Sequence, residues 1–110
     1  MSTAAAIQEV AVVLPAFNEE KDLPNLLARI RETLTAQPFK YQVIVVDDGS
    51  ADRTAEIARE AATSMPLRLI QHEKNSGLGM AIQTGLSAAM ECADLVVVMD
   101  SDNTHDPIHV

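Results

Sequence analysis

Four short apolar runs alternate with three segments of helical periodicity, and this alternation constrains the fold of the chain most strongly. The runs span residues 10–14, 41–46, 67–70 and 95–99 and are rich in Val, Ile and Leu. Continuous apolar runs of this kind are typical of strands that are covered by helices on both faces. Short connections favour parallel strands joined by right-handed crossovers. The sequence predicts an α/β fold, a Rossmann-like three-layer α/β/α arrangement with a mainly parallel sheet.

The three helical segments carry apolar residues three or four positions apart. The first is predicted to begin near Leu23, with Asp22 near the cap and Pro24 in the first turn, where its missing N–H is harmless. The second is expected at about 52–62 and the third at about 78–91. The third carries small residues that allow close approach to the sheet and need no functional explanation, namely Gly79, Ala81, Gly85, Ala88 and Ala89.

Composition excludes some classes of partner and favours one compartment. Sixteen acidic residues against eight basic ones give a net charge of −8, which disfavours nucleic acid as a partner. Cys92 is the single cysteine, so no internal disulfide can form and a reducing, cytoplasmic setting is expected. No apolar run approaches the roughly 20 residues that span a bilayer. We expect one domain, residues 1–110.

Polar clusters follow three of the predicted strands, at residues 15–20, 47–50 and 100–105. Pro15 is expected to end the first strand, because proline cannot donate to a strand ladder. Ligands of open parallel sheets bind at the carboxyl ends of the strands. Helix capping could explain any one cluster, but three clusters at the same end of the sheet indicate a binding site.

The last cluster contains two aspartates in alternation, Asp100 and Asp102, with Ser101 between them. An extended backbone points both carboxylates to one side. Such a pair suits a hard divalent cation, Mg²⁺ or Mn²⁺. Taken alone, the motif is better explained as a solvated acidic loop after a buried strand.

Nucleotide-binding glycine motifs give no better explanation. A dinucleotide-binding turn would place Gly-x-Gly-x-x-Gly after the first strand, where Pro-Ala-Phe-Asn-Glu stands, and there is no Walker A motif. Gly77-Leu78-Gly79 opens a helix but follows the third strand, and its spacing to Gly85 does not fit.

Four segments in this order and spacing resemble the N-terminal half of a family 2 glycosyltransferase with the GT-A fold. The resemblance extends from about Val10 to Pro107. Within the family, the chain most resembles the dolichyl- or polyprenyl-phosphate mannosyltransferase-like enzymes, which have a comparable Asp-x-Asp-x-x-His-x-Pro stretch. The matching segments are Val13-Leu14-Pro15-Ala16-Phe17-Asn18-Glu19-Glu20, Val45-Val46-Asp47-Asp48-Gly49-Ser50-Ala51-Asp52-Arg53-Thr54, Asn75-Ser76-Gly77-Leu78-Gly79 and Val98-Met99-Asp100-Ser101-Asp102.

The resemblance implies transfer of a sugar from a nucleotide diphosphate sugar, GDP-mannose or a UDP-sugar, to an acceptor such as a polyprenyl phosphate. Its nucleotide-sugar-binding residues map onto Pro15, Phe17, Glu19, Val46, Asp48, Asp100, Ser101 and Asp102. Of these, the first three would contact the nucleoside and the next two would border the base, with the Asp48 carboxylate accepting a base N–H. Asp100 and Asp102 would hold the ribose and the metal–pyrophosphate.

Some positions depart from the family pattern or receive no role. Phe17 stands where many members have tyrosine, so apolar packing is kept and a hydroxyl contact is lost. Thr104 stands at the place of a glutamine metal ligand, which water or His105 would replace. For His105 itself, capping of the turn before Asp106-Pro107 is favoured over metal ligation. We identify no partner for His72 or His109 and assign them no role.

The chain ends soon after the metal motif, at Val110. We therefore expect a truncated donor-binding half that is inactive alone, with a catalytic base beyond Val110 and a parent protein associated with the cytoplasmic face of a membrane. In the strand order 3-2-1-4 of the family, the fourth strand would be an unpaired edge, which predicts a homo-oligomer through this strand. The alternatives are a non-catalytic nucleotide-binding module and, with less support, a nucleotidyltransferase, whose basic glycine-rich loop is absent after the first strand.

Overall fold

The computed structural model describes residues 8–91 and 93–99. Strands and helices alternate through this part of the chain, as the sequence predicts. The elements are β1 (Glu9–Ala16), α1 (Leu23–Thr35), β2 (Lys40–Asp47), α2 (Thr54–Ala61), β3 (Leu67–Gln71), α3 (Leu78–Ala89) and β4 (Leu95–Val98). None of the helices in the described ranges is long and apolar enough to cross a bilayer.

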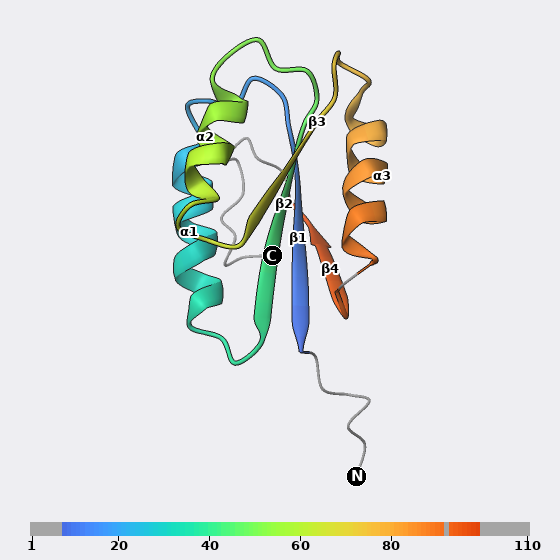
Figure 1. Ribbon diagram of the computed structural model, residues 1–110. Coiled ribbons are helices and arrows are strands. Elements are labelled where there is room, and N and C mark those ends of the chain that lie inside the picture. Colours follow the sequence, from blue (N-terminus) through green and yellow to red (C-terminus); the bar gives the residue numbers. More distant parts are fainter. Residues whose placement is uncertain (1–7, 92, 100–110) are drawn as a thin grey trace.

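The four strands form one sheet in the order β3-β2-β1-β4. Every pairing between them is parallel, and Val13 of β1 lies in register with Ile44 of β2 and Val98 of β4. Helices α1 and α2 cover one face and α3 covers the other (Figure 1). The predicted α/β class, parallel sheet and strand order are confirmed. Strand β4 lies at an edge of the described sheet, and oligomerisation through it stays a prediction.

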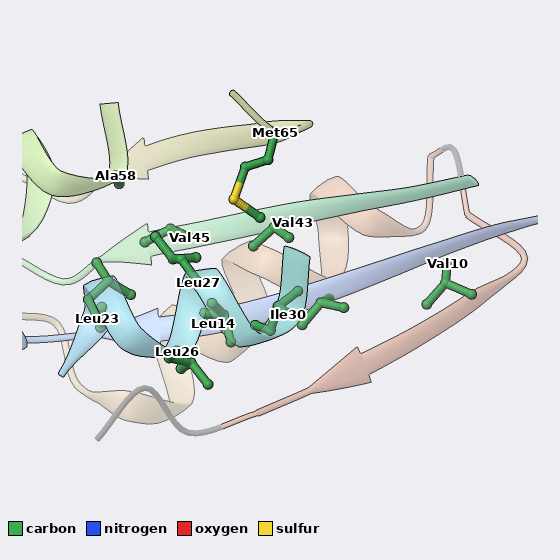
Figure 2. Packing of buried hydrophobic residues seen from close by; sticks show 12 residues of the cluster. Val10, Leu14, Leu23, Leu26, Leu27, Ile30, Val43, Val45, Ala58 and Met65 are labelled. Carbon is green, nitrogen blue, oxygen red and sulfur yellow. The ribbon is translucent and has the colours of Figure 1, made fainter. Parts of the chain in front are cut away.

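Large aliphatic side chains fill the face under α1 and α2. Leu23, Leu26 and Ile30 of α1 are at most 2% exposed and pack toward Leu14 and Val45 of the sheet (Figure 2). Truncation of such a buried side chain costs about 2–5 kcal/mol. This packing fixes α1 on the sheet, and with it the loop that leads from β1 into α1.

The opposite face, under α3, is packed with small residues. A Cβ on Gly85 would lie 2.3 Å from Cγ1 of Val13, so α3 approaches the sheet too closely for any larger residue there. Ala81 and Ala89 are also buried on this face. The predicted close packing is confirmed at Gly85. It is wrong at Gly79, where an added Cβ would have no neighbour within 4 Å.

Strand β1 continues through Pro15, contrary to the expectation that the proline ends it. Pro15 lies in register with Val46, and the strand runs to Ala16. The carbonyl of Ala16 bonds toward β2, whereas that of Val13 bonds toward the β4 side. Because alternate residues face opposite neighbours, the nitrogen of Pro15 faces the β4 side, beyond the last paired residue of β4. The missing N–H therefore removes no bond to β2.

Candidate functional site

The loops that follow β1, β2 and β3 meet at one end of the sheet, the upper end in Figure 1. They comprise residues 17–22, 48–53 and 72–77. Two sets of hydrogen bonds join them. We call the set between the first two loops the β1–β2 junction (Asn18, Glu19, Glu20, Ser50, Ala51, Asp52 and Thr54) and the other the β2–α3 junction (Asp48, His72, Ser76, Gly77 and Thr84).

Asn18 begins the β1–β2 junction. Its φ of 53° is left-handed, a conformation that asparagine tolerates better than most residues. The Asn18 Oδ1 accepts from the N–H of Ala51 at 2.9 Å, and the Asn18 N–H donates to Oγ of Ser50 at 2.8 Å. This reciprocal pair fixes the turn immediately after Phe17.

Thr54 and Asp52 complete the β1–β2 junction. Thr54 is fully buried at the start of α2; its Oγ1 accepts from the Glu19 N–H at 2.9 Å and donates to Asp52. Asp52 also accepts from the N–H groups of Thr54 and Glu20. Burial raises the pKa of Asp52, but the bonds from the Thr54 hydroxyl and these two N–H groups outweigh it, so the pKa lies below its ordinary value.

Asp48 is the centre of the β2–α3 junction and is 4% exposed. Its Oδ1 accepts from Nδ1 of His72 and from the N–H of Ser76, both at 2.8 Å, and its Oδ2 accepts from the N–H of Gly77 at 2.9 Å. Burial raises the pKa of Asp48, whereas the bond from His72 and the two backbone donors lower it, with a net pKa below the ordinary value. The carboxylate is therefore ionised at neutral pH.

His72 is a part of this site that the sequence did not reveal, and the expectation that it has no partner is wrong. Beyond its bond to Asp48, its Nε2 lies 3.0 Å from Oγ1 of Thr84 on α3, and its N–H donates to the Asp47 carbonyl. The side-chain partners lie 24 and 12 residues away along the chain. The one available signal was its position directly after a strand at the carboxyl end of the sheet.

Two glycines make the β2–α3 junction sterically possible. Gly49 has a φ of 78°, and a Cβ there would lie 2.6 Å from the backbone N of Asn75. The loops after β2 and β3 are thus in direct backbone contact. Gly77 has a φ of 100° and precedes the first turn of α3. Both positions require a backbone conformation that favours glycine.

The predicted nucleoside-binding residues divide into exposed and buried positions. Phe17 is 44% exposed on the loop after β1, and Glu19 is half-buried beside it. Pro15 and Val46 are buried, and Val46 belongs to the cluster beneath α3. The structure brings Phe17, Glu19 and Asp48 to the same end of the sheet, and their contacts with a nucleoside stay predictions.

Asp100, Ser101 and Asp102 lie outside the described residues, as do Thr104 and His105. The N–H of Met99 donates to the carbonyl of Val13 at 3.0 Å, so the chain reaches this motif beside β1, travelling toward the same end of the sheet. Within residues 8–91 and 93–99, no three His, Cys, Asp or Glu side chains form a group that could hold a metal.

A family model and curated proteins match this chain over most of its length. The model of glycosyl transferase family 2 matches residues 11–110. A dolichol-phosphate mannosyltransferase of Pyrococcus furiosus is 39% identical over 90% of the chain and 27% of its own length. An undecaprenyl-phosphate 4-deoxy-4-formamido-L-arabinose transferase of Edwardsiella ictaluri is 38% identical over 97% of the chain and 33% of its own length. The chain therefore spans about a third or less of these relatives.

Solved structures of glycosyltransferases share the fold. The mannosyltransferase PcManGT of Pyrobaculum calidifontis, in complex with GDP-Man and Mn²⁺, has a TM-score of 0.76 at 28% identity, over 90% of this chain and 29% of that one. TarS 1–349 of S. aureus, in complex with UDP-GlcNAc, has a TM-score of 0.74 at 32% identity, over 86% of this chain and 27% of that one.

Proposed function

The chain belongs to glycosyl transferase family 2, and on this basis we propose that the carboxyl end of its sheet binds the nucleotide diphosphate sugar of a sugar-transfer reaction. One observation carries this proposal. The loops after β1 and β2 are fixed to each other where β4 leads toward Asp100 and Asp102, in a chain whose structural neighbours include complexes with GDP-Man and UDP-GlcNAc.

Each predicted contact has a physical basis in the site. The exposed ring of Phe17 offers an apolar surface to a nucleoside, while Pro15 and Glu19 flank it on the same segment. The ionised carboxylate of Asp48 is an acceptor for an N–H of the base, and Val46 lies two residues before it, in β2. These residues would bind and orient the donor, without taking part in bond cleavage.

Asp100 and Asp102 would hold the divalent metal. Carboxylate oxygens suit Mn²⁺ and Mg²⁺, which keep places for phosphate oxygens. Two structural neighbours were solved with Mn²⁺, PcManGT and a glucosyl-3-phosphoglycerate synthase of Mycobacterium tuberculosis. When bound, such an ion neutralises charge on a departing nucleotide diphosphate.

A polyprenyl phosphate is the acceptor that we propose for the complete reaction, in the synthesis of a cell-envelope glycan or glycolipid. The support comes from relatives named as dolichol-phosphate and undecaprenyl-phosphate transferases. The chain spans about a third or less of the length of these relatives. Experiments on this chain therefore test the binding of the sugar donor, and not the binding of the acceptor.

Isothermal titration calorimetry of the chain with GDP, UDP and their sugars, with and without Mn²⁺, tests this proposal. We expect Mn²⁺ to strengthen the binding of one nucleotide diphosphate by at least about tenfold, since a bridging cation offsets repulsion between carboxylates and phosphates. Asp102→Ala should abolish this metal dependence.

Glu32→Ala is the matched control, because Glu32 is an exposed acid near the opposite end of α1. It should bind like the unmodified chain. Binding that is independent of metal and unaffected by Asp102→Ala would contradict the assigned metal ligands. If the unmodified chain bound none of these nucleotides or their sugars, the proposed function would be overturned.

A further inference from the structure

The hydrogen bonds around His72 determine where its protons lie. The pKa of Asp48 is lowered, so its carboxylate is ionised and can only accept hydrogen bonds. Nδ1 of His72, 2.8 Å from Oδ1 of Asp48, must therefore carry a proton. In the neutral ring, Nε2 then accepts from the Thr84 hydroxyl at 3.0 Å, and in the charged ring it donates to that same oxygen. Thr84 can thus bond to His72 in both states.

His72 also limits how the Asp48 carboxylate can turn. Oδ1 accepts two bonds, one from His72 and one from the Ser76 N–H, while Oδ2 accepts one from Gly77. The two backbone donors belong to the turn before α3, whereas the imidazole reaches the carboxylate from the end of β3. Donors from two directions hold the carboxyl plane in one orientation, and a third bond also compensates for its burial.

We propose that His72 is a positioning residue for nucleotide binding, one that holds Asp48 ionised and correctly oriented for the base, with Thr84 fixing the ring from α3. This inference rests on the proposed function, because it assigns His72 a role through Asp48 at the nucleotide site. It adds His72, on the loop after β3, and Thr84, on α3, to the residues after β1 and β2 that the proposed function assigns to nucleotide binding.

The order Asp48, His72, Thr84 also has the hydrogen-bond pattern of a hydrolytic triad, but its surroundings do not suit acyl transfer. Such a triad needs free N–H donors beside the nucleophile to stabilise an oxyanion. Thr84 lies within α3, seven residues after the cap residue Gly77, and the backbone N–H groups of a helix interior are bonded to carbonyls of the same helix. The geometry is that of an orienting chain of hydrogen bonds.

Three substitutions separate positioning from general stability. His72→Leu removes both ring nitrogens, and we expect about tenfold weaker nucleotide diphosphate binding from the loss of one charge-assisted bond. His72→Asn places an amide N–H near the position of Nδ1 and should restore binding to within about threefold of the unmodified chain. Thr84→Val keeps the shape of the side chain and should weaken binding about twofold to threefold.

Thr35→Val is the matched control for Thr84→Val. Thr35 bonds to Tyr41 near the opposite end of the sheet, so its loss should leave nucleotide binding unchanged. Thermal melting of every variant verifies that the chain is folded before binding is compared.

Nitrogen-15 chemical shifts of His72 test the inference without any nucleotide. We expect the proton of the neutral ring to reside on Nδ1. A proton on Nε2 instead, or unchanged nucleotide binding by folded His72→Leu, would overturn the positioning role and leave the proposed function standing. If the unmodified chain binds no nucleotide, the proposed function fails, and the role of His72 in binding fails with it.

Discussion

The two junctions at the carboxyl end of the sheet lie side by side but are built differently. In the β1–β2 junction, neutral side chains and Asp52 bond to backbone N–H groups of a neighbouring loop, and the central hydroxyl, Thr54, is fully buried. In the β2–α3 junction, a single buried carboxylate, Asp48, collects an imidazole and two backbone donors. One junction shares its bonds among several residues and the other concentrates them on one charge.

This difference predicts different responses to substitution. A junction with distributed bonds should lose stability in modest steps, because each bond contributes about 0.5–1.5 kcal/mol net. A junction that depends on one carboxylate and on direct backbone contact should fail more abruptly. The proposed nucleotide site lies across both junctions. The responses of the two junctions to substitution therefore also show which of the loops at this site tolerate change.

The largest effect is expected at Gly49, where the loops after β2 and β3 touch. Gly49→Ala places a Cβ 2.6 Å from the backbone N of Asn75 at a φ of 78°, so both strain and overlap arise. We expect a loss of about 3 kcal/mol or more in the free energy of unfolding, measured by urea denaturation.

Two other glycines serve as controls for this prediction. Gly77→Ala carries a positive φ of 100° with open space around the added Cβ, and should cost about 1–2 kcal/mol from backbone strain alone. Gly79→Ala has open space within a helix and should stabilise the fold by up to about 1 kcal/mol. Equal losses at Gly49 and Gly77 would show that the backbone contact is unimportant.

The sequence predicts the elements and the end of the sheet at which the site lies, because both depend on local patterns. Apolar runs and helical periodicity located every strand and helix of the described chain. The Asn and Asp of the β1–β2 junction are turn and cap residues whose preference for such positions is also local. The β1–β2 junction therefore consists of residues whose turn and cap positions the sequence indicates.

The features that were missed depend on which face of an element a residue occupies. Gly79 and Gly85 look alike in sequence, yet Gly85 alone packs against Val13. Pro15 is accepted within β1 because of the neighbour that its nitrogen faces. His72 contacts Asp48 because β3 pairs with β2, and it contacts Thr84 because α3 packs over the sheet. Periodicity does not determine such registers, so these contacts could not be predicted.

A second, smaller effect is expected in the β1–β2 junction. Thr54→Val keeps the shape of the side chain but removes the hydroxyl that accepts from the Glu19 N–H and donates to Asp52. We expect a loss of about 2 kcal/mol in the free energy of unfolding. Thr54→Ser should recover most of it, because the hydroxyl returns. Thr63→Val, at an exposed bond after α2, is the matched control and should cost less than about 0.5 kcal/mol.

If Thr54→Val cost as much as Gly49→Ala, the contrast between distributed and concentrated bonding would be wrong. Nucleotide binding gives an independent measure of the same contrast. Thr54→Val loosens the loop after β1, which carries Phe17 and Glu19, and should therefore weaken nucleotide binding. The bond between His72 and Asp48 should remain visible in the nitrogen-15 shifts of His72 in this variant.

The smallest effect is expected in acid, and it distinguishes the two aspartates. Both have a pKa below the ordinary 3.8, so each contributes stability that is present above that value and is lost as the pH falls through the lower folded pKa. Asp48→Asn or Asp52→Asn should therefore reduce the acid dependence of the free energy of unfolding below about pH 4. In His72→Leu, carboxyl ¹³C titration should show a raised pKa for Asp48, since one lowering contact is gone, and no change for Asp52. Matching rises at both carboxyls would mean that the two junctions titrate as one unit, and that the separation between them does not hold.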